Sequence, residues 1–433
     1  MTRSWLPTGL AILLMAGCLP ARSESIPAQL IDARLELMRE VAAAKWIAGL
    51  PIADPAREAA LLAELADSAL RYGLEPEGVV RLFEAQINAA RVIQSYWFAS
   101  WESHRAAPPD TASSLGLDLR PRISALGEQI LAALATAPAP ADAYQFDQVV
   151  SVEGLPDADK FAIREALLTL RGYPNRLAQV VESGRLRIGM AADYAPFSAA
   201  GTDDAPAGLD VDLAAGLAAD LGVSLEIVRT SWPSLIDDLL ANRYDVGMGG
   251  ISLTEDRARV AAFTRPYHAD GKTPIVRCAD LARFPSLEAI DQPGVRVVFN
   301  PGGTNERFVR ERLMQATRML HPDNRSIFDE LVAGRADVMF TDRIEVELQT
   351  ERHPELCAAM ETNLTYQEKA YLLPRDAVWQ GCVDTWLAAR IADTTVDAAF
   401  ERHGVIRRPP RGEVQALLPS SAGSLPHCQH SPN

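Results

Sequence analysis

The segment VRVVFNPGGTNE, residues 295–306, contains the pattern that decides the fold of the larger half of this chain. The run from Val295 to Phe299 is apolar apart from Arg296, and it leads through Asn300 and Pro301 into a glycine pair. This order predicts a buried strand, a tight turn and a helix that runs from Asn305 to Met319. Backbone N–H groups at a helix N-terminus bind anions, so the glycine turn is also a candidate ligand site.

The same alternation of strand and helix recurs on both sides of this segment. Strands are expected at 186–190, 225–228, 245–248 and 338–340, and helices at 210–221 and 233–240. Strands that alternate with helices predict a parallel α/β sheet, here in two lobes. Ligands of such sheets bind at the carboxyl ends of the strands.

Residues 26 to about 172 have a different pattern. Apolar residues recur at helical spacing, for example Leu61, Leu62, Leu65 and Ala69, and no strand-like alternation interrupts them. The fold class predicted for the chain is therefore an all-α N-terminal domain followed by an α/β two-lobed domain.

Composition restricts the classes of partner. The chain has 433 residues, 48% of them apolar, and its 42 basic and 57 acidic side chains give a net charge of −15. Nucleic acids and anionic membrane surfaces select basic proteins, so neither is an expected partner. Small-molecule substrates are expected instead, and an anionic one would need a few local Arg and Lys side chains. A homo-oligomer is left open.

The N-terminus resembles a targeting segment. Arg3 precedes an apolar run, Leu6 to Gly17, that is too short to span a bilayer, and residues 21–23 are suited to cleavage after Ser23. We therefore expect a signal peptide over residues 1–23, no membrane span and a periplasmic protein. Residues 15–18 also resemble a lipoprotein box, and lipid anchoring at Cys18 is the less favoured alternative because Met15 is a poor first residue for one.

Four cysteines remain after such processing: Cys278, Cys357, Cys382 and Cys428. Their number is even, no CxxC is present, and no His stands at metal-ligand spacing, which favours disulfides over a metal site. Four cysteines allow three pairings, and arithmetic does not choose among them.

The first domain has polar residues at positions where a helix that packs in a core should be apolar. Arg34 and Lys45 are eleven residues apart, so they fall within roughly 20° on one helix face and about 16 Å apart along the axis. Gln94 lies in a later helix, and Asp54 precedes Pro55. In the plainer interpretation, Arg34 and Lys45 lie on the solvated surface of the protein and Asp54 is a helix N-cap.

The segments AKW (44–46) and LPIADPAR (50–57) resemble the secreted, all-helical class of chorismate mutases. The resemblance implies that Arg34 and Arg57 hold substrate carboxylates, that Lys45 and Gln94 address the ether oxygen, and that Asp54 binds a hydroxyl. The chain departs from the family pattern at two places. Ala90 stands where some members have a hydroxyl residue, and a second carboxylate-binding arginine has no certain match, with Gln129 aligned best and Arg122 nearby.

In the second domain, Ser252, Arg257 and Asp342 each follow an expected strand, and Thr304 belongs to the glycine turn. This layout resembles the two-lobed periplasmic amino-acid-binding proteins. The resemblance implies a periplasmic-binding-protein-like fold in which the Arg and the Thr hold a carboxylate and the Asp meets an amine.

Three further segments, DGKTP (270–274), NPGGTNE (300–306) and KAYLLPR (369–375), resemble the periplasmic cyclohexadienyl dehydratases. By that resemblance Glu306 is the general acid, a carboxyl group whose pKa is raised in a closed, dry cleft. Arg257 holds the side-chain carboxylate, Lys272 adds positive charge near the hinge, and Trp232 forms a wall of the cleft. The resemblance also implies a Cys278–Cys357 disulfide, whereas Cys382 with Cys428 would tether the tail.

The two resemblances imply consecutive reactions. Chorismate would rearrange to prephenate in a domain over residues 24–175, and prephenate would become phenylpyruvate, or arogenate phenylalanine, in a domain over residues 176–408. Residues 409–433 are expected to be a flexible tail. No cofactor, no metal and no feedback inhibition by phenylalanine are expected. The alternatives are an amino-acid-binding transport or sensor protein with a helical oligomerisation domain, and an enzyme with one active half.

Overall fold

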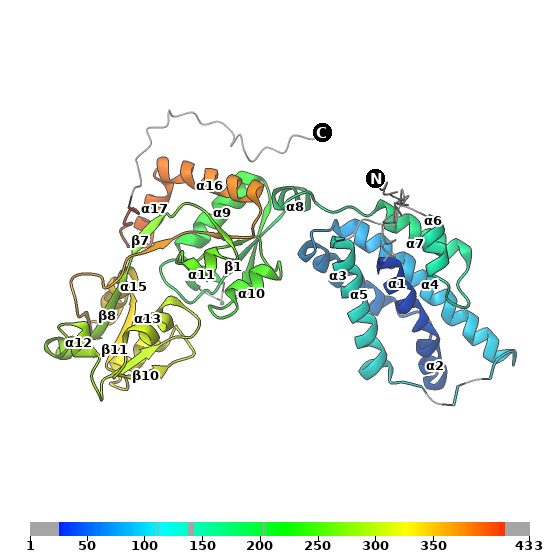
Figure 1. Cartoon of the computed structure of the whole chain (residues 1–433), viewed down its shortest axis with the longest axis horizontal. Helices are drawn as coiled ribbons and strands as arrows, with labels where there is room; N and C mark the ends of the chain where they lie inside the picture. Colours follow the sequence, from blue (N-terminus) through cyan, green and yellow to red (C-terminus); the bar gives the residue numbers. More distant parts are fainter. Residues whose placement is uncertain are drawn as a thin grey trace, which may run out of the picture. The chain divides into compact units, whose positions relative to one another are not determined.

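The computed structural model describes residues 26–411, apart from 108, 111, 137–142, 202 and 204. The predictions for the signal peptide, for Cys18, for Cys428 and for residues 412–433 of the tail lie outside the described residues. Contacts divide the chain into two compact units. One comprises residues up to 60 together with 81–170, and the other comprises 61–80 together with the chain from residue 171 onward (Figure 1).

Helices form the first part of the chain. They are α1 (Ile26–Glu36), α2 (Met38–Ala48), α3 (Pro55–Arg71), α4 (Pro76–Glu102), a π-helical turn (Leu115–Leu119), α5 (Arg120–Thr136), α6 (Ala143–Val149) and α7 (Asp157–Thr169). The unit that contains residues 26–60 and 81–170 is called the helical unit below. The remainder is called the α/β unit, so the fold class predicted from the sequence is confirmed.

Local signals explain where α2 ends and α3 begins. Gly49 ends α2 in the left-handed conformation, at φ 64°, which glycine adopts without a steric cost. Asp54 then caps α3: its carboxylate accepts the N–H of Arg57 at 3.2 Å, while the Glu58 side chain accepts the N–H of Asp54 at 3.3 Å. These reciprocal hydrogen bonds resemble a capping box, with Glu58 one residue beyond the usual position, and they fix Asp54 at the start of α3.

The first lobe of the α/β unit is built on a five-stranded sheet in the order β4-β1-β5-β14-β6. The strands are β4 (Ser224–Arg229), β1 (Arg185–Met190), β5 (Val246–Gly247), β14 (Leu372–Leu373) and β6 (Ala262–Phe263). The helices are α8 (Arg176–Ser183), α9 (Leu209–Leu221), α10 (Leu235–Leu240), α11 (Glu255–Ala258), α16 (Ala377–Ala392) and α17 (Thr395–Arg402), and β2 (Ala199–Ala200) pairs with β3 (Pro206–Ala207). β4, β1 and β5 are parallel, as the alternating pattern predicts.

The second lobe has the sheet order β10-β9-β11-β8-β12. Its strands are β8 (Lys272–Arg277), β9 (Arg296–Phe299), β10 (Thr317–Leu320), β11 (Val338–Asp342) and β12 (Leu356–Ala358). Its helices are a 3-10 turn (Cys278–Arg283), α12 (Leu287–Ile290), α13 (Thr304–Arg312), α14 (Ile327–Val332) and α15 (Arg343–Arg352). Cys278, at the start of the 3-10 turn after β8, forms a disulfide with Cys357 of β12, with their Cα atoms 4.9 Å apart.

The helix expected to reach Met319 is shorter than predicted. It ends at Arg312, and residues 317–320 form β10 instead. The reason is Asp291, whose carboxylate accepts the N–H groups of Met314, Gln315 and Ala316 at 2.9, 2.7 and 2.9 Å. These donors are therefore not free to continue the helix.

Two short strands, β7 (His268–Asp270) and β13 (Gln367–Lys369), pair antiparallel where the chain passes between the lobes. Lys369 ends β13, and Lys272 begins β8 directly after β7. The link between the lobes therefore positions both lysines, and Asp342, the last residue of β11, is the register partner of Lys272.

Apolar side chains fill a separate core in each lobe. The larger core packs β1 and β5 against α9, α16 and α17, and includes the fully buried Trp379 and Trp386. Cys382 is buried in this core. In the part of the chain that the structure describes, none of the helices is both long and apolar enough to cross a membrane.

Candidate active sites

A cleft lies between the lobes of the α/β unit, the usual place for a small-molecule site in a two-lobed protein. Five residues singled out in the sequence line it: Trp232, Ser252, Arg257, Thr304 and Asp342. It is also lined by residues that the sequence analysis did not single out: Tyr194, Gly250, Asn300, Gly303, Asn305, Asn324, Thr341 and Lys369.

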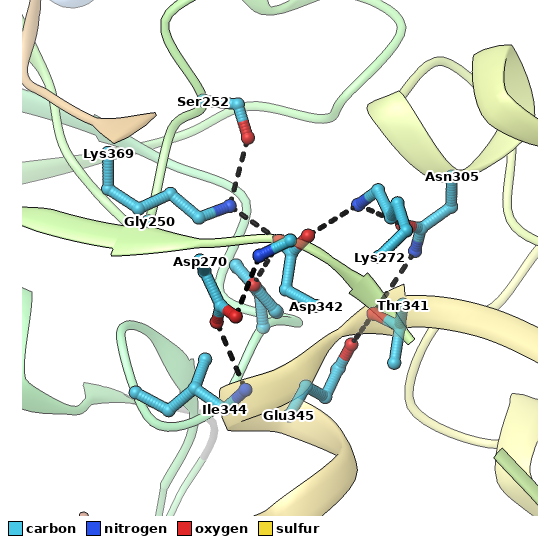
Figure 2. Close-up of polar contacts among 12 residues, drawn as sticks. Gly250, Ser252, Asp270, Lys272, Asn305, Thr341, Asp342, Ile344, Glu345 and Lys369 are labelled. Carbon is cyan, nitrogen blue, oxygen red and sulfur yellow. Dashed lines mark hydrogen bonds and ion pairs between the residues drawn. The ribbon is translucent and has the colours of Figure 1, made fainter. Parts of the chain in front are cut away.

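Asp342 lies at the centre of a buried network of charges (Figure 2). Lys272 donates to Asp342 Oδ1 at 2.7 Å, and Lys369 donates to Oδ2 at 2.5 Å. The Tyr194 hydroxyl also donates to Oδ2, at 2.6 Å. The resemblance implies that Asp342 meets an amine of the ligand; in this structure two ammonium groups of the protein bind its carboxylate.

The ionic states follow from this arrangement. Burial opposes a charged carboxyl group, yet the two lysines hold the pKa of Asp342 well below its usual value. Burial lowers the pKa of Lys272, and Asp342 opposes that shift. The sequence analysis expected Lys272 to add charge near the hinge; it is 1% exposed and also donates to Asn305 Oδ1 at 2.5 Å.

Lys369 is a site residue that the sequence analysis missed. It is 1% exposed, and it joins Ser252 Oγ, at 2.9 Å, to Asp342. One sequence signal points to it: the chain has only four lysines among its 42 basic residues. An arginine-rich chain keeps lysine where a compact point charge is needed, and three of these four lie at the candidate sites.

Arg257 is the cation available for an anionic ligand. Its guanidinium donates to the Ser252 carbonyl at 2.9 Å, and it forms no ion pair within the described residues. Burial lowers its pKa to about 10, so it stays charged at neutral pH. A half-buried arginine that has no carboxylate partner among the described residues is well suited to receive one from a substrate.

The glycine turn brings Thr304 to the cleft. Gly302 has φ 79°, and a Cβ atom there would lie 2.4 Å from the backbone nitrogen of Pro233, so only glycine fits. Trp232, next to Pro233, lines the cleft and donates its indole N–H to Asp193 at 2.9 Å. The turn therefore packs against the segment that carries the predicted wall of the cleft.

Glu306 does not have the environment predicted for it. Its carboxylate accepts the Gly302 N–H at 2.7 Å and pairs with Arg310 at 2.7 Å. These contacts lower the pKa of Glu306, against the raised value that was expected. The side chain is 22% exposed and lines a neighbouring pocket together with Arg307 and Arg310. That pocket shares Arg257, Gly303 and Thr304 with the cleft of Asp342. The resemblance located the segment but not the environment of this carboxyl group.

Glu345 has the environment that Glu306 lacks. It is 2% exposed, and burial, aided by the negative charge of Asp342, raises its pKa to about 8. Its carboxyl group hydrogen-bonds the hydroxyl of Thr341, which lines the cleft (Figure 2). The sequence analysis missed Glu345. The sequence signal for Glu345 is its position as an acidic residue in the first turn of the helix that follows Asp342. An acidic residue there is also explained by a favourable interaction with the helix dipole.

The helical unit brings several of its predicted residues together. Arg34 is buried and donates to Gln86 Oε1 at 3.2 Å, and burial lowers its pKa to about 10. Gln94 is buried and its nearest polar contact is Met38 Sδ, at 3.8 Å. Three buried atoms there have no partner within the described residues: Arg34 Nε, Gln86 Nε2 and Gln94 Oε1. Unpaired buried polar atoms are costly, which points to a bound ligand.

Lys45 lies at the end of α2 and donates to the Ile52 carbonyl. Burial lowers its pKa, and Glu58 and Asp54 oppose that shift. Arg57 is exposed on the first turn of α3. The adjacent Glu58 pairs with Arg91 rather than with Arg57. The role of Arg57 as a carboxylate ligand stays a prediction.

The positions that depart from the mutase pattern also have defined environments. Ala90 is buried on α4. Arg122 pairs with Glu40 at 3.2 Å, and both line a groove together with Gln129 and Trp97. The described residues contain no cluster of three or more His, Cys, Asp or Glu side chains that could hold a metal ion.

Comparison with known proteins agrees with this geometry. Residues 186–405 match the model of bacterial extracellular solute-binding proteins, family 3, and residues 28–95 match that of chorismate mutase type II. A cyclohexadienyl dehydratase from Pseudomonas aeruginosa is 49% identical over 223 residues, which cover 51% of this chain and 83% of that protein. An arginine-binding ABC transporter protein from Escherichia coli is 25% identical, over 41% of this chain and 71% of its own length.

A solved structure, of an ancestral amino acid-binding protein described as a precursor of cyclohexadienyl dehydratase, is 30% identical with a TM-score of 0.50. It covers 52% of this chain and 98% of the other. The chain thus belongs to the family 3 bacterial extracellular solute-binding proteins and carries a chorismate mutase type II domain ahead of that region.

Proposed function

We propose that the protein is a bifunctional enzyme that converts chorismate to prephenate in the helical unit and dehydrates the product in the cleft of the α/β unit. The second step yields phenylpyruvate from prephenate, or phenylalanine from arogenate. The relative from Pseudomonas aeruginosa supports the dehydratase, and the match to chorismate mutase type II supports the mutase. The product of the first reaction is the substrate of the second.

The mutase step is an intramolecular rearrangement that needs no nucleophile and no proton donor. Catalysis comes from holding the reactive conformer and from donors aimed at the ether oxygen, which gains charge. Lys45 and Gln94 donate to that oxygen, Arg34 and Arg57 hold the carboxylates, and Asp54 binds the hydroxyl. The unpaired donor atoms of Arg34 and Gln86 support this assignment, because a carboxylate would satisfy both.

The dehydratase step needs one proton. The ring C–O bond breaks and the hydroxyl leaves as water; the bond from the ring to its carboxylate also breaks, CO₂ leaves, and that electron pair completes the aromatic ring. A neutral carboxyl group with a raised pKa is suited to supply the proton. We assign it to Glu345. The Thr341 hydroxyl donates to the Glu345 carboxyl group in the structure, so the transfer requires this hydrogen bond to reverse. Glu345 then gives its proton to Thr341 Oγ1 as the Thr341 hydroxyl proton passes to the leaving hydroxyl, and Glu345 is reprotonated from solvent.

The other cleft residues position the substrate. Arg257 holds the side-chain carboxylate, with help from Thr304 and Ser252, and Trp232 forms an apolar wall. The single observation that carries the dehydratase assignment is the 49% identity over 223 residues to a cyclohexadienyl dehydratase. The choice of Glu345 as proton donor rests on its burial and on its hydrogen bond with the hydroxyl of Thr341 in the cleft wall.

The alternative, a protein that only binds an amino acid, is not favoured. The ammonium group of a bound amino acid would need the carboxylate of Asp342, to which Lys272 and Lys369 already donate hydrogen bonds. We further propose a periplasmic location, which the extracellular character of the family supports. Homo-oligomerisation stays a prediction.

The test of the proton donor is a matched pair of variants, Glu345→Gln and Glu306→Gln, assayed with prephenate. We expect Glu345→Gln to lower kcat by about 10²–10⁴, the usual contribution of a proton donor, while Glu306→Gln stays within about threefold of the wild type. Chorismate mutase activity and the melting temperature report folding in both variants. An active Glu345→Gln beside an inactive, folded Glu306→Gln would return the role to Glu306.

A further inference from the structure

The first lobe holds a buried carboxylate that the proposed mechanism does not use. Asp210 lies in the first turn of α9, is fully buried, and forms no ion pair within the described residues. Its Oδ2 atom accepts the N–H groups of Gly249 and Gly250, each at 2.8 Å, and the Tyr267 hydroxyl at 2.7 Å. Its Oδ1 atom accepts the Tyr371 hydroxyl at 3.2 Å. A buried charge is costly, so these neutral donors are what keeps the carboxylate ionised.

Two of these donors belong to the loop that follows β5 and forms one wall of the cleft. The N–H of Met248 still bonds within the sheet, to the Gly189 carbonyl at 3.0 Å, and the next two N–H groups turn to Asp210. Gly250 and Ser252 of this loop line the cleft. Asp210 therefore fixes the backbone behind that wall.

The same loop orients the arginine assigned to the substrate carboxylate. The Arg257 guanidinium donates to the Ser252 carbonyl at 2.9 Å, and Ser252 Oγ binds Lys369 at 2.9 Å (Figure 2). A shift of the loop would therefore displace Ser252 and Arg257 together. Glu345, the assigned proton donor, belongs to α15 of the other lobe.

The two hydroxyl donors come from the segments that link the lobes. Tyr267 directly precedes β7, and Tyr371 lies two residues after Lys369, the last residue of β13. Their ring centroids are 4.9 Å apart. The carboxylate of Asp210 thus joins α9 and the cleft loop to both links.

We propose that Asp210 is a positioning residue of the dehydratase, whose ionised carboxylate holds the cleft loop in the conformation that presents Ser252 and Arg257 to the substrate. The inference rests on the proposed dehydratase function and adds a residue that does not touch the substrate. The ionised form is required because all four neighbours donate. A proton on Asp210 would find no acceptor there and would have to displace one of these hydrogen bonds.

The ionisation of Asp210 lies within reach of an ordinary pH titration. Burial raises its pKa to about 6, against the hydrogen bonds from Tyr267, Gly250 and Gly249. The titratable groups that face it are Tyr267 and Tyr371, and burial raises the pKa of both hydroxyls well above the usual value, so neither ionises in this range. Because the pKa of Asp210 is raised, its ionisation at pH 7 costs folding free energy, and a role in stability alone would favour a neutral side chain.

The experiment measures kcat and KM for prephenate in the full-length protein between about pH 5 and 7, with the rate without enzyme subtracted. In the wild type we expect KM to rise as the pH falls through about 6, while kcat changes by less than about threefold because Glu345 stays protonated. Asp210→Asn is a neutral side chain of the same size. It should raise KM at pH 7 by about tenfold, with little change in kcat, and abolish the pH dependence of KM.

Two further variants sharpen the test. Tyr267→Phe removes one donor to the anion, so the pKa of Asp210 should rise and the increase in KM should begin about one pH unit higher. Asp212→Asn is the matched control on the same helix. It neutralises an exposed carboxylate that pairs with Arg402 and His403, and it should leave the KM profile unchanged.

The outcomes separate this inference from the proposed function. No turnover of prephenate by the wild type at any pH would contradict the dehydratase itself. A wild-type KM that does not change with pH, beside normal turnover, would overturn the inference and leave the dehydratase intact. An increase that persists in Asp210→Asn would belong to another group, such as Asp193, whose pKa burial also raises, and would overturn it too. If Asp210→Asn did not fold, a profile that Tyr267→Phe fails to move would still overturn the inference.

Discussion

The candidate sites of the helical unit and the α/β unit differ in how their buried polar groups are paired before an anionic substrate binds. In the helical unit, Arg34 and Gln94 are buried with polar atoms that have no partner among the described residues. In the α/β unit, Lys272, Asp342 and Lys369 are buried and fully engaged with one another. In the helical unit, buried polar atoms are left for a ligand to pair. In the cleft of the α/β unit, the buried charges are already paired with one another.

The difference follows from the two reactions. A rearrangement within one molecule needs only donors that match the charge formed in the transition state. Loss of water needs a proton as well, and a carboxyl group keeps its proton near pH 7 only where burial and a nearby negative charge hold it neutral. Asp342 therefore acts on Glu345 as well as on the lysines.

After the loss expected for Glu345→Gln, the next largest expected effect separates the two sites. Lys45→Ala should lower kcat for chorismate by about 10²–10³, because it removes one donor to the ether oxygen. Conversion of prephenate should be unchanged, since Lys45 belongs to the helical unit. Both rates are measured on the same sample. Equal loss of both activities in a folded protein would contradict the assignment of one reaction to each unit.

The next effect concerns substrate binding in the cleft. Arg257→Ala removes a charge-assisted hydrogen bond worth about 1.5–3 kcal/mol, so kcat/KM for prephenate should fall by about 10- to 100-fold. The mutase should retain its kcat/KM for chorismate. If steady-state kinetics with prephenate were unaffected, Arg257 would not be the carboxylate ligand.

A smaller effect is expected from pH. The protonated form of Glu345 is the active one, and its pKa is about 8. The dehydratase kcat should therefore be constant between pH 6 and 7 and fall about tenfold per pH unit well above 8. Circular dichroism at each pH checks that the fold persists. A kcat that is already falling at pH 5 would instead indicate a donor with a lowered pKa, such as Glu306.

The smallest effect on activity is expected from the disulfide. Cys278 and Cys357 close a loop of 79 residues, nominally worth about 4 kcal/mol. The double variant Cys278→Ser/Cys357→Ser should lower the melting temperature of the α/β unit by about 10 °C, with mutase activity and its thermal inactivation unchanged. Calorimetry that shows the loss in both units would mean that they unfold together.

Sequence patterns were sufficient for the architecture because each pattern is local. Helical spacing before residue 172 and strand–helix alternation after it follow directly from side-chain periodicity. The helix predicted to reach Met319 failed because Asp291, a residue distant from it in sequence, binds the N–H groups that would have extended it.

The candidate sites were predictable only in part. A resemblance identifies residue types at positions, so Arg34, Arg257 and Asp342 could be selected. It does not give the environment of a carboxyl group, which depends on burial and on neighbours from other elements. Glu306 was expected to have a raised pKa, and its pKa is lowered, whereas that of Glu345 is raised. Asp342 was expected to meet an amine of the ligand, and two lysines of the protein bind it.

The most direct test of the whole account supplies purified protein with chorismate alone and identifies the products over time. The account predicts transient prephenate followed by phenylpyruvate, because both units are active in one chain. Prephenate that accumulates without further change would contradict the dehydratase, and unchanged chorismate beside consumption of added prephenate would contradict the mutase.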